Sequence, residues 1–145
     1  MKLVVALLAA ASLTSAANAQ SRFDPNQGFN PPISDEMVAG LSNAVLDGMS
    51  EMQCGEAACA PATAADRAWG LLPREEAREL IRKGMVSQIG ACAGVDWNRA
   101  AFAPMMADYR HRQKKSQRQL AYIAALHGAG MGVVLNALGG SCPKN

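Results

Sequence analysis

The sequence contains none of the short motifs that mark common enzyme active sites. It has no GxSxG turn, no HExxH segment and no CxxC or CxxCH pair, so the signatures of serine hydrolases, zinc proteases and cysteine-held metals or haem are absent. Aromatic residues make up only 5% of the chain. No segment alternates apolar and polar residues over the length of a strand, which argues against a sheet-based fold.

A large excess of either charge is also missing. The chain has 14 Lys and Arg against 12 Asp and Glu, a formal net charge of +2. This balance indicates no particular partner. Since no aromatic residues are interleaved with the basic ones, we expect no nucleic-acid partner. We also expect no cofactor.

The N-terminus has the layout of a secretory signal peptide. Lys2 precedes an uninterrupted apolar run at residues 3–11, and the small-residue pattern Ala17-Asn18-Ala19 follows. This layout predicts cleavage of residues 1–19 and a periplasmic or secreted protein. A membrane anchor is disfavoured because the apolar run is too short to span a bilayer.

Four cysteines remain after this cleavage, and an even number in an exported chain predicts two disulfides. Four cysteines allow three pairings. We favour the pairing that closes the tight turn CGEAAC and ties the C-terminus to the body of the protein. In the loop-entropy model the long closure is worth about 4 kcal/mol and the short one about 2 kcal/mol. The favoured pairs are Cys54–Cys59 and Cys92–Cys142.

Capping residues, prolines and helical periodicity predict an all-α fold, a small disulfide-stapled bundle of four to five helices. Residues 20–33 carry three prolines without a periodic apolar face, so we expect an extended leader before a single helical domain at residues 34–145. Pro73 suits the first turn of a helix, whereas Pro104 should kink or break one. The helices are expected at residues 35–53, 63–72, 73–93, 96–109 and 116–138.

The last helix permits three interpretations, because residues 120–138 contain no charge. A membrane span is disfavoured, since His127 and Asn136 are costly in lipid and the basic residues before it would lie outside the cell. Catalysis by His127 lacks a recognisable nucleophile nearby in the sequence. We favour a central, buried helix that packs closely against another through small residues. The small residues form two stripes, Ala121, Ala125 and Ala129, and Ala124, Gly128 and Gly132.

Two further features carry charge that a partner or substrate could use. Asp108 and His111 are three residues apart and are candidates for a carboxylate–imidazole pair on a helix surface. A basic segment without acidic residues is the candidate partner-binding surface, suited to a protein or to an anionic component of the envelope. It consists of Arg110, Arg112, Lys114, Lys115 and Arg118.

These observations favour an exported, non-enzymatic helical protein that binds another macromolecule of the cell envelope, such as an inhibitor, an immunity-type protein or an assembly accessory. We assign no catalytic and no metal-binding residue. One alternative is a membrane-active protein that uses the small-residue stripe at residues 121–132. A second alternative is a small hydrolase or metal-binding protein that uses His127 or the Asp108–His111 pair.

Overall fold

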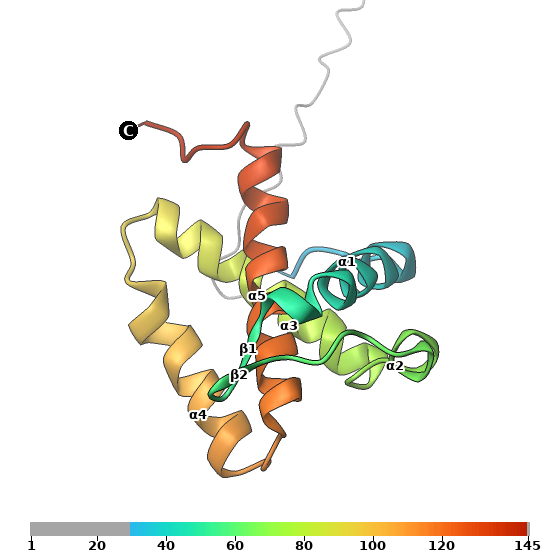
Figure 1. Cartoon of the computed structure of the whole chain (residues 1–145). Helices are drawn as coiled ribbons and strands as arrows, with labels where there is room; N and C mark the ends of the chain where they lie inside the picture. The colour runs from blue at the N-terminus through green and yellow to red at the C-terminus, as the bar shows by residue number, and fades with distance from the viewer. Residues whose placement is uncertain (1–29, 145) are drawn as a thin grey trace, which may run out of the picture.

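A computed structural model describes residues 30–144 of the chain, and it confirms the all-α class (Figure 1). The signal peptide and most of the leader lie outside the described residues. The helices are α1 (Asp35–Asp47), α2 (Ala64–Trp69), α3 (Arg74–Cys92), α4 (Ala103–His111) and α5 (Gln117–Ala137). A 3₁₀ turn (Met49–Glu51) follows α1, a π-helical turn (Asn98–Phe102) precedes α4, and β1 (Gln53–Cys54) pairs with β2 (Ala57–Ala58).

Side-chain caps explain where several helices begin. The Ser34 hydroxyl accepts a hydrogen bond from the backbone N–H of Met37 at the start of α1. Thr63 and Asp66 form the expected capping box of α2, each side chain accepting from the other residue's backbone N–H. Ser116 opens α5 in the same way with its own partner three residues on. The starts of these helices are therefore encoded locally.

The first helix is shorter than predicted. It ends at Asp47, with Gly48 as its C-cap, and the chain then passes through the 3₁₀ turn into the antiparallel hairpin. Strands of two residues are too short to show alternation, so the sequence pattern could not reveal them. The disulfide Cys54–Cys59, with its Cα atoms 4.9 Å apart, closes this hairpin.

Pro104 lies in the first turn of α4 and follows a distortion in the fourth predicted helix. The five residues before α4 form the π-helical turn, and Phe102 and Ala103 keep right-handed helical backbone angles across the junction. The helix is therefore widened next to the proline and not broken there. The chain there is wider than a regular helix, and this turn carries Phe102 toward α5.

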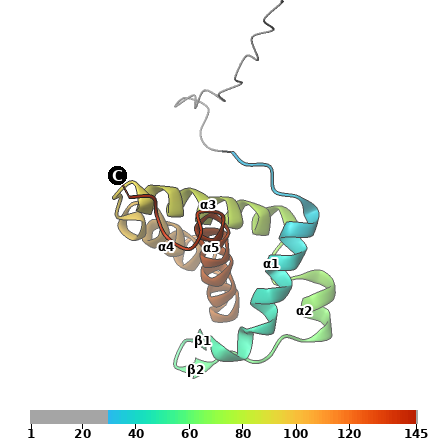
Figure 2. The same ribbon diagram turned by 90° about the horizontal axis from the view of Figure 1, so that it is seen from above.

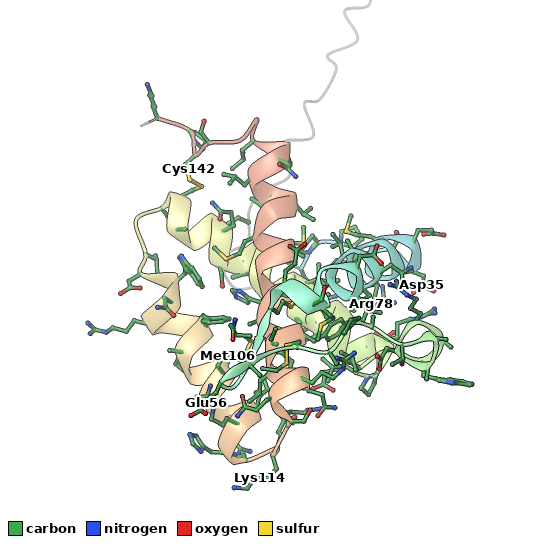
Figure 3. The ribbon with its side chains drawn as sticks, viewed as in Figure 1. Asp35, Glu56, Arg78, Met106, Lys114 and Cys142 are labelled. Carbon is green, nitrogen blue, oxygen red and sulfur yellow. A yellow bond between two sulfur atoms is a disulfide. The ribbon has the colours of Figure 1, made fainter. Side chains whose placement is uncertain are left out.

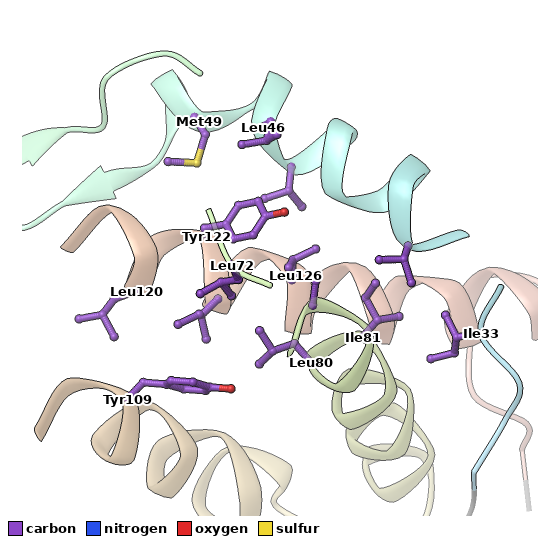
Figure 4. Close-up of a cluster of buried hydrophobic side chains, with 14 of the residues drawn as sticks. Ile33, Leu46, Met49, Leu72, Leu80, Ile81, Tyr109, Leu120, Tyr122 and Leu126 are labelled. Carbon is purple, nitrogen blue, oxygen red and sulfur yellow. The ribbon is translucent and has the colours of Figure 1, made fainter. Parts of the chain in front are cut away.

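The core lies where α3 and α5 meet, with α1 and α4 on opposite sides of this pair (Figure 2). Leu80 and Ile81 of α3 and Leu126 of α5 are buried at the centre (Figure 4). Met49 and Tyr109 close the core from the α1 and α4 sides. This cluster joins residues from Ile33 to Leu126 within the described part of the chain.

Only the first half of α5 has the buried environment that we predicted. Leu120, Ile123 and Leu126 are at most 4% exposed, whereas the residues from Met131 onward are half-buried or exposed. Figure 1 shows the last turns of α5 extending past the other helices toward the C-terminus. Among the described residues α5 is the one helix long and apolar enough to cross a membrane, and 33% of its most apolar stretch is buried.

Candidate functional site

The candidate site is positioned by a crossing at which the backbones of α3 and α5 touch. A Cβ atom placed on Gly84 would overlap the carbonyl oxygen of His127 and lie 2.9 Å from its carbonyl carbon. A Cβ atom on Gly130 would overlap the carbonyl of Ile81 in the same manner. Any side chain at either position would force the helices apart, so both glycines are needed for this approach.

The prediction of close packing through small residues of α5 is right for one of the two stripes. Ala121, Ala125 and Ala129 pack against the core, whereas Gly128 and Gly132 of the other stripe have open space beside them. Gly130 follows Leu126 by four residues and His127 by three, so it shares their buried face of the helix. The face that packs was determined by the large buried residues and not by the spacing of the small ones.

The crossing places His127 beside a serine that is 40 residues away in the sequence. The Nε2 atom of His127 lies 2.9 Å from the Oγ atom of Ser87, and the two residues are 1% and 5% exposed. The ring of Trp97 stacks on the imidazole with centroids 5.6 Å apart, and the Phe102 ring is 5.0 Å away. No nucleophile stands near His127 in the sequence, but the fold brings the hydroxyl of Ser87 next to its imidazole.

The imidazole of His127 has an environment that favours its neutral form. Burial lowers its pKa below the ordinary value of 6.5, and the positive charge of Lys83 lowers it further. A neutral imidazole next to a serine hydroxyl is the pairing that nucleophilic hydrolases use, together with a carboxylate that orients the ring. Within the described residues no carboxylate is hydrogen-bonded to His127. The same part of the chain contains no group of three His, Cys, Asp or Glu residues placed to hold a metal.

A cavity of about 450 Å³ opens beside this pair, and we name it the His127 cavity. It lies between α3, the π-helical turn and α5. Its polar lining consists of Glu79, Arg82, Lys83, Ser87 and His127. Its remaining lining consists of Val86, Gly90, Val95, Trp97, Ala100, Ala101 and Met105. A cavity of this size, largely apolar with a few polar groups on one side, is typical of small-molecule sites.

A second hollow of about 440 Å³ lies between α3 and the half-buried end of α5, and we name it the C-terminal groove. The disulfide Cys92–Cys142 holds the chain after α5 against the end of α3, with its Cα atoms 5.2 Å apart. Both favoured disulfide pairs are therefore present in the structure. The groove is lined by Met85, Ile89, Cys92, Val133, Val134, Ala137, Leu138 and Pro143.

The predicted basic segment divides into two parts in the structure. Lys115 lies 3.1 Å from both carboxylate oxygens of Glu76, and its side chain is 17% exposed. Arg118 donates to the carboxylate of Asp66 at 2.7 Å and to the backbone carbonyls of Ala60 and Pro61. These two cations link separate segments of the domain. Because their side chains are largely covered in ion pairs, a partner has little access to their charge.

Three cations of the basic segment stay exposed: Arg110, Arg112 and Lys114. Arg112 is paired at 2.9 Å with Asp108, which also accepts from the side chain of Gln113. Within the described residues no hydrogen bond or ion pair joins Asp108 to His111. The candidate carboxylate–imidazole pair is thus replaced by an arginine pair one residue further along the helix.

Comparison of the chain with family models, curated proteins and solved structures found no match. The sequence indicates His127 as a candidate site residue. It gives no such indication for the residues that line the same cavity, which include Ser87, Trp97, Arg82 and Lys83. Only Gly84, in the middle of an otherwise strong helix, was a local signal that another chain segment approaches there.

Proposed function

We propose that this chain is an exported, non-enzymatic binding protein and that its partner is another protein of the cell envelope. Two disulfides are typical of a protein from an oxidising compartment. The signal-peptide layout of residues 1–19 supports export to the periplasm or beyond. The remaining question is which surface the partner contacts.

The observation that carries the proposal is the position of the exposed apolar side chains. Five large apolar residues are at least 40% exposed among the described residues, and four of them border the two hollows beside the last turns of α3. Small soluble domains seldom gather exposed apolar residues in this way without a partner. The four residues are Val86, Ile89, Val95 and Leu138.

The C-terminal groove suits an amphipathic helix of the partner protein. It runs between two helices, its lining is almost wholly aliphatic, and Ile89 and Leu138 are 40% and 41% exposed at its edges. A helix that lays its apolar face in such a groove is a recurrent mode of protein recognition. The exposed cations lie at the opposite end of the molecule, as the positions of Lys114 and Cys142 show (Figure 3).

Photo-crosslinking in the cell envelope tests this assignment. A benzophenone side chain is introduced at Ile89 or Leu138 in the groove and, as matched exposed controls, at Gln113 or Glu56. We expect one discrete crosslinked protein from both groove positions and none from the controls. Crosslinks that form only at Gln113 would instead support the basic segment as the binding surface.

A second candidate function is association with a membrane, which the exposed half of α5 favours. In this case the groove residues would contact lipid and the purified protein would require detergent. Liposome flotation discriminates the two functions, because a protein-binding groove predicts that the protein stays with the soluble material. The packing of Ala121, Ala125 and Ala129 against the core favours the first function, since these residues of the small-residue stripe are already covered by protein.

A further inference from the structure

The His127 cavity has charged residues along one side, and the proposed binding of a partner in the C-terminal groove does not account for them. Arg82 and Lys83 are its two cations and Glu79 is its one acid. The guanidinium of Arg82 pairs through one terminal nitrogen with Glu79, while its Nε atom is buried and has no hydrogen-bond partner. Lys83 is exposed and takes part in no ion pair with a described residue. One positive charge at the cavity is therefore unbalanced.

The opposite wall of the cavity is apolar and aromatic. Trp97 and Met105 line it, together with Val95, which is 49% exposed, while Val86 of α3 borders the cations and is 45% exposed. His127 adds no charge at neutral pH in its buried position, so the cations stand only on the α3 side. A ligand complementary to this surface has an apolar body and a single anionic group.

We propose that the His127 cavity binds an amphipathic carboxylate of the medium-chain fatty acid class. The apolar chain packs against Trp97 and Met105, and the carboxylate accepts hydrogen bonds from Arg82 and Lys83. The volume of about 450 Å³ lies within the range of pockets that enclose such small molecules. This proposal is independent of the protein partner, because the cavity and the C-terminal groove lie on different sides of α3.

The two tryptophans of the chain provide a direct readout. Trp97 lines the cavity, whereas Trp69 is 85% exposed and is absent from the cavity lining. In a Trp69→Phe variant of the mature protein, fluorescence reports on Trp97 alone. We expect decanoate, added below its micellar concentration, to change this emission in a saturable way. Decanol, which has the same chain without the charge, should bind about tenfold more weakly because it loses a charge-assisted hydrogen bond.

Matched variants separate the cavity from general charge. Lys83→Gln should weaken decanoate binding about tenfold, whereas Lys114→Gln removes the same charge from an exposed site after the end of α4 and should leave it unchanged. Ala101→Leu places extra volume in the cavity and should reduce the binding of both ligands. Circular dichroism checks that each variant is folded.

Three results would overturn the proposal. Equal affinity for decanol and decanoate, or an unchanged decanoate affinity in the Lys83→Gln variant, would show that the cations do not bind the carboxylate. The third is an absence of decanoate binding to the folded protein by calorimetry. All three measurements use the isolated protein, so they remain interpretable whether or not Ile89 and Leu138 crosslink to a partner.

Discussion

Gly84 of α3 lies directly against the backbone carbonyl of His127 in α5, so closely that no other residue fits at position 84. This contact determines how the two longest helices cross. The pairing of His127 with Ser87, one turn further along α3, follows from it. The core, the His127 cavity and the C-terminal groove are all arranged around this crossing.

Alanine substitutions test the crossing. Gly84→Ala and Gly130→Ala should each destabilise the protein by about 3 kcal/mol, because their methyl groups meet backbone atoms that cannot move independently. Gly128→Ala is the matched control, since its surroundings are open, and it should stabilise the helix by up to about 1 kcal/mol. Urea denaturation measures all three. Equal effects at Gly84 and Gly128 would contradict the backbone contact.

His127 should make the stability depend on pH. The unfolded chain carries a histidine with an ordinary pKa near 6.5, whereas the folded chain lowers this pKa by burial. The unfolded state therefore binds the proton first, and stability is lost as the pH falls through 6.5 toward the lower folded value. His127→Gln should flatten this part of the profile, measured by denaturation at a series of pH values.

The second histidine gives the control for this experiment. His111 is exposed and has no hydrogen-bond partner among the described residues, so His111→Gln is the same substitution made outside the core. A profile that responds to His111 and not to His127 would show that the buried imidazole is not the group that titrates.

The two disulfides should contribute unequally. Cys92–Cys142 closes a separation of 50 residues and Cys54–Cys59 one of 5, so their removal should cost about 4 and about 2 kcal/mol in the loop-entropy model. Replacing Cys92 and Cys142 by serine should also raise hydrogen exchange at the end of α5. Thermal unfolding and exchange measure these effects, and a larger loss from the hairpin pair would contradict the order.

Two cations of equal charge should differ in their structural importance. Arg118 donates to Asp66 and to two backbone carbonyls, so Arg118→Gln should cost about 2 kcal/mol. Arg110→Gln, at an exposed site, should change stability by less than about 0.5 kcal/mol. Chemical denaturation distinguishes these outcomes. Charge reversal to test partner binding by the basic segment should use Arg110, Arg112 and Lys114, because Lys115 and Arg118 are paired within the domain.

Local signals predicted much of the fold. Ser34, Thr63 and Ser116 begin helices because each satisfies backbone N–H groups within a few residues. Pro73 limits a helix through its own geometry. The disulfide Cys54–Cys59 and the tight turn that it closes were predicted, but the two strands beside the turn were not, since strands of two residues are too short to produce a pattern.

The candidate site could not be predicted in this way, because it depends on contacts between distant segments. Ser87 and His127 come together only after α3 and α5 cross. The rotation of α5 that brings Gly130 rather than Gly128 to the contact depends on how the large side chains pack. The division of the basic segment likewise depends on Glu76 and Asp66, which lie 39 and 52 residues from their partners.

Fractionation of cells that express the full chain tests export and the burial of α5 together. We expect a processed protein in the soluble periplasmic or secreted fraction, which migrates faster on a gel without reductant because both disulfides are closed. A protein that stays with carbonate-washed membranes would contradict it and assign the exposed half of α5 to lipid. An unprocessed, reduced protein in the cytoplasm would contradict export itself.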